Sequence, residues 1–208
     1  MHLLQYRRET TITGARAATT YGEHVSGDIA RELADAGTVI VAGGSYGIEA
    51  AAHRSSLAEG KPSIAVIANG IDRHYPAGHA ELFSGIISNG AVVSELPPGS
   101  APTRAHFIAR SRLLAALSDT TIIVEAGARS MALRTAAEAE TLGRGIGAVP
   151  GPVTRSASSG AHELIRTGTA QLVTSGRDVR LLQADRAAPL PTRSVFRASP
   201  DQAPQRMI

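Results

Sequence analysis

The chain of 208 residues contains no cysteine and no tryptophan, and aromatic residues make up only 3% of it. Because cysteine is absent, a disulfide scaffold, a thiolate zinc site and a cysteine nucleophile are excluded, and a reducing compartment is expected. Because aromatic rings are few, the core must consist mainly of alanine, valine, isoleucine and leucine. Such a core suits thin helices packed on a parallel sheet.

Long apolar runs are also absent, since none approaches the ~20 residues that a membrane span requires. The first eight residues lack the apolar segment of a secretory signal, because charged residues follow almost at once. We therefore expect a cytoplasmic protein that has no membrane partner. Hydrophobic residues form 43% of the chain, an ordinary share for a globular domain with one substantial core.

Lysine is nearly missing: Lys61 is the only lysine among 21 basic residues, so the other 20 are arginine. The planar guanidinium group suits phosphate binding and stacking on bases. A GC-rich genome would produce the same bias, and the formal net charge is only +3. The charge alone therefore supports a nucleic-acid ligand only weakly.

Short apolar runs alternate with helical stretches along the chain. Strands are expected at about 10–13, 39–42, 64–67, 91–94, 122–124 and 146–149, and helices at about 20–36, 48–59, 78–89, 105–117, 131–142, 161–166 and 178–182. Strands that alternate with such helices pair in parallel through right-handed crossovers. The predicted fold is α/β, a Rossmann-like doubly wound, mostly parallel sheet flanked by helices. It forms one domain over residues 1–183, followed by a flexible, proline-containing tail at 184–208.

Two of the junctions between strand and helix are rich in glycine: Gly14-Ala15-Arg16, and Gly43-Gly44-Ser45-Tyr46-Gly47. Glycine lets backbone N–H groups approach an anion, and the helix that follows adds positive potential at its start. These loops predict a phosphate-bearing ligand at the carboxyl ends of the strands. An ordinary turn with a solvated arginine explains the first loop equally well, and the second matches neither the dinucleotide fingerprint nor the P-loop.

A third set of candidates lies on the helix expected near residue 105, where Arg104, Arg110 and Arg112 accompany Phe107. An aromatic ring flanked by guanidinium groups is typical of sites that hold an unpaired base and its phosphates. A phenylalanine that simply belongs to the core is the alternative. Arg110 and Arg112 lie on different sides of the helix, so at most one can face a ligand, and the other can pair with a carboxylate.

Arg129 and Ser130 follow the fifth expected strand and add donors to the same edge of the sheet. Glu125 at that strand's end would repel phosphate unless it holds an arginine, and we predict that it pairs with Arg110 or Arg112.

Glu49 and His53 have the spacing of half a metal site, but no further ligand accompanies them, so a pair on the helix surface is expected. We expect neither a metal nor a cofactor, and no serine belongs to a catalytic triad.

Together these residues resemble the DNA-processing protein A family, also called DprA or Smf. The resemblance is collinear from Thr13 to about Leu182. Its blocks are 14–16, 20–22, 43–44, 47–53, 65–72, 75–76, 94–99, 107–118, 124–127, 135–136 and 148–152.

The resemblance implies a non-catalytic protein that binds and protects single-stranded DNA, forms a homodimer and helps to load a RecA-type recombinase. It implies that Arg16 contacts the phosphate backbone and that Arg104 and Phe107 form a basic–aromatic pair. It also implies that the second glycine loop and the Arg129-Ser130 loop line the same pocket.

The chain departs from the family pattern in four places: Ala15 stands for serine, Glu49 for aspartate, Ser111 for asparagine and Met131 for glycine. Longer members also carry a helical domain and often a winged helix, and here only the Rossmann-like core is expected.

Two other interpretations remain open. In the first, the chain is an enzyme or sensor for a small nucleotide, related to phosphoribohydrolases, with Glu138 or Glu125 as the catalytic carboxylate beside Arg129. The absence of a Pro-Gly-Gly-x-Gly-Thr run counts against it. In the second, the chain is an architectural dimer that neither binds DNA nor turns over a substrate.

Overall fold

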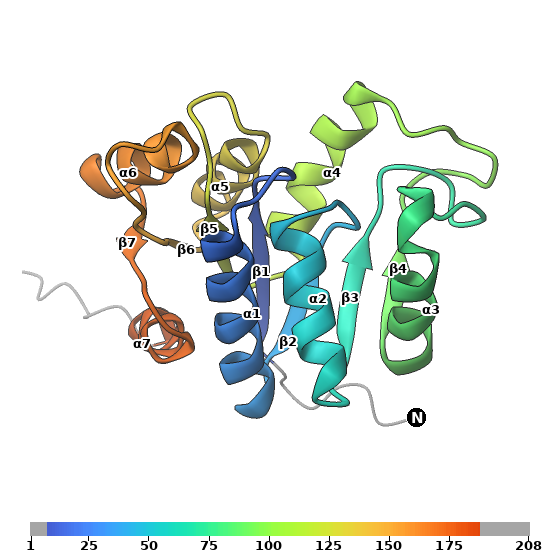
Figure 1. Ribbon diagram of the computed structural model, residues 1–208, viewed down its shortest axis with the longest axis horizontal. Helices are drawn as coiled ribbons and strands as arrows, with labels where there is room; N and C mark the ends of the chain where they lie inside the picture. Colours follow the sequence, from blue (N-terminus) through green and yellow to red (C-terminus); the bar gives the residue numbers. More distant parts are fainter. Residues whose placement is uncertain (1–7, 188–208) are drawn as a thin grey trace, which may run out of the picture.

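The computed structural model describes residues 8–187, and the side chains of residues 8–184. Within this part of the chain, seven strands form one parallel sheet in the order β4-β3-β2-β1-β5-β6-β7 (Figure 1). The strands are β1 (Glu9–Gly14), β2 (Val39–Ala42), β3 (Ser63–Val66), β4 (Ala91–Val93), β5 (Thr120–Val124), β6 (Gly145–Ala148) and β7 (Gln171–Leu172). The predicted α/β, Rossmann-like parallel sheet is confirmed.

In residues 8–187, seven α-helices and two short 3₁₀ helices connect or follow the strands. They are α1 (Thr20–Asp35), α2 (Ile48–Ala58), η1 (Ala77–His79), α3 (Ala80–Asn89), α4 (Arg104–Ala116), α5 (Ala132–Thr141), η2 (Ser156–Ser158), α6 (Ser159–Arg166) and α7 (Gly176–Ala187). Helix α7 runs past the predicted domain boundary, so residues 184–187 are helical. The rest of the predicted tail lies outside the described residues.

The helices cover both faces of the sheet, with α1, α2, α3 and α7 on one face and α4, α5 and α6 on the other (Figure 1). Side chains alternate along a buried strand, so one strand feeds two cores. In β5, Ile122 and Val124 pack in the core with α1 and α7, whereas Ile123 packs with the alanines of α5. The aliphatic, ring-poor core expected from the composition is what fills both layers.

The order of the strands reverses beside β1. From β1 the chain proceeds outward through β2 and β3 to β4, and then crosses back to place β5 on the other side of β1. In open α/β sheets such a reversal leaves a crevice beyond the carboxyl ends of the strands, which is the usual place for a ligand. The loops after β1, β2 and β5 all reach this edge.

Candidate nucleic-acid interface

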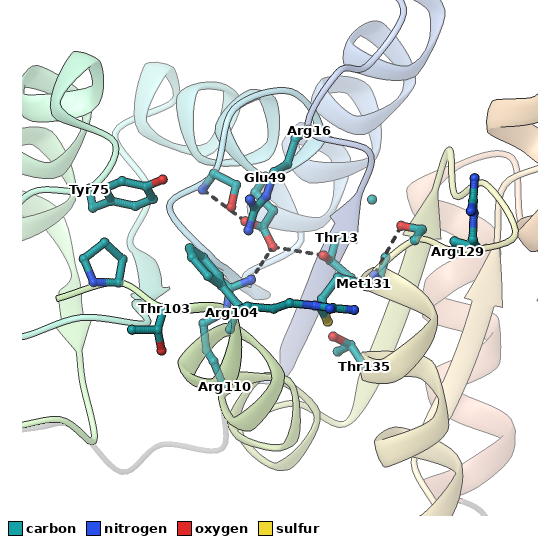
Figure 2. Close-up of a pocket in the computed structure, with 16 residues that line it drawn as sticks. Thr13, Arg16, Glu49, Tyr75, Thr103, Arg104, Arg110, Arg129, Met131 and Thr135 are labelled. Atoms are coloured by element: carbon teal, nitrogen blue, oxygen red, sulfur yellow. Dashed lines mark hydrogen bonds and ion pairs between the residues drawn. The ribbon is translucent and has the colours of Figure 1, made fainter.

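A cavity of about 580 Å³ opens at the carboxyl end of β1, between the loops after β1 and β2 and the starts of α4 and α5 (Figure 2). Eight of the twelve predicted binding residues line it: Gly14, Arg16, Ser45, Arg104, Phe107, Arg110, Arg129 and Ser130. The other four, Gly43, Gly44, Gly47 and Arg112, do not line it. The structure therefore brings four separate predicted loops and helix ends together around one opening.

The floor of the cavity is a buried ion pair between α4 and α2. Arg110 Nη2 donates to Glu49 Oε1 at 3.2 Å, and both side chains are less than 8% exposed. Glu49 also accepts from Thr13 Oγ1 at 2.9 Å and from the Ser45 amide at 3.1 Å. Burial by itself raises the pKa of Glu49, but the Arg110 charge and these hydrogen bonds outweigh it, so the pKa is lowered. Glu49 is thus ionised, and the pair is internally neutral.

This pair corrects two predictions. Glu125 contacts neither arginine: Arg110 pairs with Glu49, and Arg112 pairs with Glu95 at the surface, outside the cavity. The expected surface pair of Glu49 and His53 is also wrong, because both side chains are buried. Sequence spacing placed them on one helical face, and that face is the one that packs against the sheet.

The buried His53 side chain holds the glycine loop after β2 through a hydrogen bond to its backbone. Its Nε2 donates to the Gly43 carbonyl at 2.8 Å, and its Nδ1 lies 2.7 Å from Ser63 Oγ. Burial lowers the pKa of His53 to about 4, so the ring is neutral near pH 7. The ring is 0% exposed and holds the loop rather than a ligand.

The glycines of this loop are packing residues. A Cβ at Gly43 would lie 2.1 Å from Arg110 Nη1, so a side chain there would displace the buried ion pair. Gly47 has a φ of 72° and sits against the Ala15 carbonyl, a conformation and a closeness that favour glycine. Gly44 faces the Phe83 ring. The loop is glycine-rich because two loops and an arginine meet there.

The Phe107 ring lies against the guanidinium groups of two arginines. The Arg16 guanidinium carbon lies 4.3 Å from the ring centroid and that of Arg110 lies 5.3 Å from it. The ring is only 9% exposed, so little of its face is open to a base. Its guanidinium neighbours are Arg16 and Arg110, whereas Arg104 was the one expected beside it. A cation over an aromatic face is a favourable contact, so Phe107 helps to hold Arg16 in place.

The rim of the cavity carries the exposed cations. Arg16, Arg104 and Arg129 are exposed, and none of them forms an ion pair with any described residue. Figure 2 shows the extended Arg104 side chain reaching from α4 toward the start of α5. Glu49 is the only acidic residue that lines the described cavity, and Arg110 neutralises it. The rim is therefore positively charged.

Sequence reasoning missed several lining residues, among them Thr13, Tyr75, Thr103 and Thr135. Thr13 is the last side chain of β1 before Gly14, a position that could have signalled it. Tyr75 is 44% exposed and its ring lies 6.0 Å from that of Phe107. Only the fold reveals that proximity, because the segment that carries Tyr75 is far from both glycine loops in sequence.

Met131, which stands where a glycine was expected, lines the cavity with ordinary helical angles, φ −64° and ψ −26°. Its backbone does not require glycine. Its neighbour Ser130 also lines the cavity, and Ser130 Oγ accepts from the Ala132 amide at 3.3 Å.

Glu125 lies outside this cavity. Its carboxylate accepts from the Thr19 amide at 2.8 Å and from Thr19 Oγ1 at 2.5 Å, just before α1 begins. It contributes to a separate cavity of about 300 Å³, lined by Thr19, Thr20, Tyr21, Glu125, Pro152 and Arg155. Glu138 lines neither cavity.

Over residues 8–187, no cluster of histidine, aspartate and glutamate has an arrangement that could hold a metal ion. No helix there has both the length and the apolar character needed to cross a membrane.

Comparison with known proteins gives consistent matches. The family model described as DNA recombination-mediator protein A matches residues 1–182. The chain is 39% identical to the DNA processing protein DprA of Streptococcus pneumoniae, covering 86% of this chain and 62% of that protein. It is 37% identical to Protein Smf of Escherichia coli over 82% of this chain and 46% of that protein. The chain spans about half the length of the curated relatives it matches.

Among solved structures, DNA processing protein A from Helicobacter pylori superposes with a TM-score of 0.78 at 30% identity. The match covers 86% of this chain and 81% of that one, and the structure is described as showing a single-stranded DNA binding mode. A molybdenum cofactor binding protein from Rippkaea orientalis superposes with a TM-score of 0.64 at 14% identity. This last likeness shows a shared fold alone.

Proposed function

The chain belongs to the DNA recombination-mediator protein A family, and we propose that it binds single-stranded DNA in the cavity at the carboxyl end of β1. The observation that carries this proposal is that Arg16, Arg104 and Arg129 surround one opening, and that no carboxylate among the described residues is left to neutralise them. A flexible polyanion supplies the missing negative charge. The H. pylori relative, whose structure is described as showing how it binds single-stranded DNA, supports the same ligand.

Phosphates are common to all DNA sequences, so recognition through guanidinium groups gives binding without sequence preference. Tyr75, at the edge of the cavity, offers the more exposed ring for stacking against a base, and Phe107 keeps Arg16 in place. This assignment differs from the one that the sequence suggested. Phe107, which was expected to stack on a base, instead positions Arg16, and the stacking ring belongs to Tyr75, which the sequence did not single out.

The proposal is tested by fluorescence anisotropy with labelled oligo-dT. Replacing Arg16 and Arg104 together by alanine removes two charge-assisted phosphate contacts, and we expect affinity to fall by roughly 10- to 100-fold. Arg112→Ala is the matched control, because Arg112 lies on α4 but outside the cavity and pairs with Glu95. A double variant that binds as tightly as the wild type would show that the site is misplaced.

We further propose that the protein is a non-catalytic mediator that acts in the cytoplasm as a homodimer, protects single-stranded DNA and assists a RecA-type recombinase. The family supports this role, and it is tested separately. Sedimentation velocity measures the oligomer, and recombinase filament formation on DNA is followed with and without the protein. A monomer that leaves filament formation unchanged would remove the mediator role while leaving DNA binding intact.

Hydrolysis of a small nucleotide is disfavoured by the state of the acidic residues. Glu125 and Glu138, the carboxylates that this interpretation would use, do not line the cavity that Arg129 lines. The one carboxylate that does, Glu49, is held by Arg110, Thr13 and the Ser45 amide. Such a carboxylate is poorly placed to act as a general acid or base on a substrate. Incubation with AMP is expected to release no adenine, and release above the rate of a blank would favour the enzyme.

A further inference from the structure

The start of α1 already holds a negative charge that belongs to the protein. The Glu125 carboxylate, 5% exposed, accepts hydrogen bonds from both the amide and the hydroxyl of Thr19, the N-cap residue of α1. In nucleotide-binding α/β folds, a phosphate group lies at the start of the helix that follows the first strand, where backbone N–H groups and positive potential converge. Here a side chain from the end of β5 occupies that position.

The chain departs from ordinary backbone geometry to place this side chain. Glu125 has a φ of 50°, and it is the only residue other than glycine with a positive φ in the described part of the chain. That left-handed conformation is uncommon for a residue of this size. Space is also reserved for the carboxylate: a Cβ at Gly22 would lie 2.2 Å from Glu125 Oε2. The backbone at Glu125 and the missing side chain at Gly22 thus both accommodate the Glu125 carboxylate.

Room for a ligand exists directly outside. The cavity of about 300 Å³ beside Glu125 is lined by Tyr21 and by the exposed Arg155. Its walls offer a ring and a cation, which are the groups that a nucleotide would contact. Within this cavity the acidic lining residue is Glu125, so the feature that opposes an anionic ligand is that carboxylate.

We propose that Glu125 is a specificity-determining residue that closes the start of α1 to phosphate groups and so excludes mononucleotides from this cavity. Its charge repels a phosphate, and its two hydrogen bonds occupy the Thr19 amide and hydroxyl, two of the donors at the start of α1. A phosphodiester chain is then confined to the Arg16 side of the loop that joins β1 to α1. The exclusion of mononucleotides concerns the smaller cavity alone, whereas the path of the phosphodiester chain rests on the proposed binding of single-stranded DNA.

The test compares Glu125→Asn with Glu125→Asp. Asparagine and aspartate both tolerate the left-handed conformation, have almost the same size and differ in charge. Glu125→Gly, which also tolerates that conformation, removes the side chain entirely. AMP and inorganic phosphate are titrated by calorimetry, and ¹H–¹⁵N spectra follow the amides of Thr19, Thr20 and Tyr21.

We expect Glu125→Asn and Glu125→Gly to bind both probes with millimolar dissociation constants, with shifts at those three amides. The wild type and Glu125→Asp should bind at least tenfold more weakly. Arg155→Ala in the Glu125→Asn background should weaken AMP binding again.

Three results would overturn the proposal. The first is a wild type that binds AMP at these amides as well as Glu125→Asn does. The second is a folded Glu125→Asn variant that gains no binding. The third is loss of folding in both Glu125→Asn and Glu125→Gly, which would make Glu125 a purely structural cap. Circular dichroism distinguishes the last two, and oligo-dT binding reports on the other cavity separately.

Discussion

The two cavities that flank the loop between β1 and α1 differ in the source of their negative charge. In the larger one, Arg16, Arg104 and Arg129 surround the opening. The single lining carboxylate, Glu49, forms an ion pair with Arg110. In the smaller one, the protein provides the anion itself, through Glu125 at the start of α1. Under our two proposals, the same edge of one sheet has a cavity that binds a polyanion beside a cavity that the Glu125 carboxylate closes to phosphate. The positions of the protein's own carboxylates would then decide which cavity can bind a phosphate.

The largest expected effect is on the free energy of unfolding, when the buried ion pair of Arg110 and Glu49 in the larger cavity loses its carboxylate. Glu49→Gln leaves the Arg110 charge buried without a counter-ion, and loss of one partner of a buried pair costs about 3–5 kcal/mol. Chemical denaturation measures the change. Glu95→Gln is the matched control, because its pair with Arg112 is exposed and should contribute at most about 1 kcal/mol. Equal effects of the two substitutions would contradict the distinction between a buried and a surface pair.

A smaller effect is expected from acidification. The folded pKa of His53, about 4, lies below the ordinary 6.5, so the unfolded chain binds its proton first as the pH falls. His53 therefore favours the folded state fully above pH 6.5, and this contribution is lost as the pH falls from 6.5 toward 4. Its size is on the order of 3 kcal/mol. Glu49, whose pKa is lowered from the ordinary 4.5, adds a loss in the same direction once the pH falls below 4.5.

Urea unfolding at a series of pH values checks this prediction. In His53→Gln the slope of stability between pH 6.5 and pH 4 should flatten, although the variant is less stable at neutral pH. A wild-type stability that does not change over that range would show that His53 accepts its proton without unfolding the loop.

The smallest expected effect is on oligo-dT affinity, and it compares a tyrosine of the larger cavity with a tyrosine of the smaller one. Tyr75 and Tyr21 are equally exposed, at 44%, but Tyr75 lines the larger cavity and Tyr21 the smaller one. Tyr75→Ala should weaken oligo-dT binding about tenfold, at the lower end of the ~1–3 kcal/mol that stacking on one base contributes. Tyr21→Ala should leave it unchanged. If both weaken binding alike, DNA follows a path over both cavities.

The elements of the fold were predictable because their signals are local. The span predicted for β2, 39–42, is the one observed, since a short apolar run between a turn and a glycine cluster has few other uses. Strand β7 was missed because it has two residues, both exposed, and no apolar pattern. The edge at which the glycine loops meet also followed from the sequence, because parallel strands align their carboxyl ends.

The pairing of charges was not predictable in the same way. Glu125 was assigned to an arginine because it stands near a predicted phosphate site, yet its partner is Thr19, 106 residues away. Arg110 instead meets Glu49, which the helical spacing had assigned to the surface with His53. Both outcomes depend on which face of α2 packs inward and on how α4 crosses the sheet. These are tertiary facts that the spacing of single residues does not contain.

The central claim is that exposed guanidinium groups at the larger cavity neutralise the phosphates of single-stranded DNA. The most direct measurement is the salt dependence of oligo-dT affinity for the wild type and for the variant with alanine at positions 16 and 104. The account predicts that the magnitude of the log–log slope falls by about 0.7 for each phosphate contact removed. Parallel slopes for the two proteins would contradict it, because the two arginines would then not be the groups that displace counter-ions from the DNA.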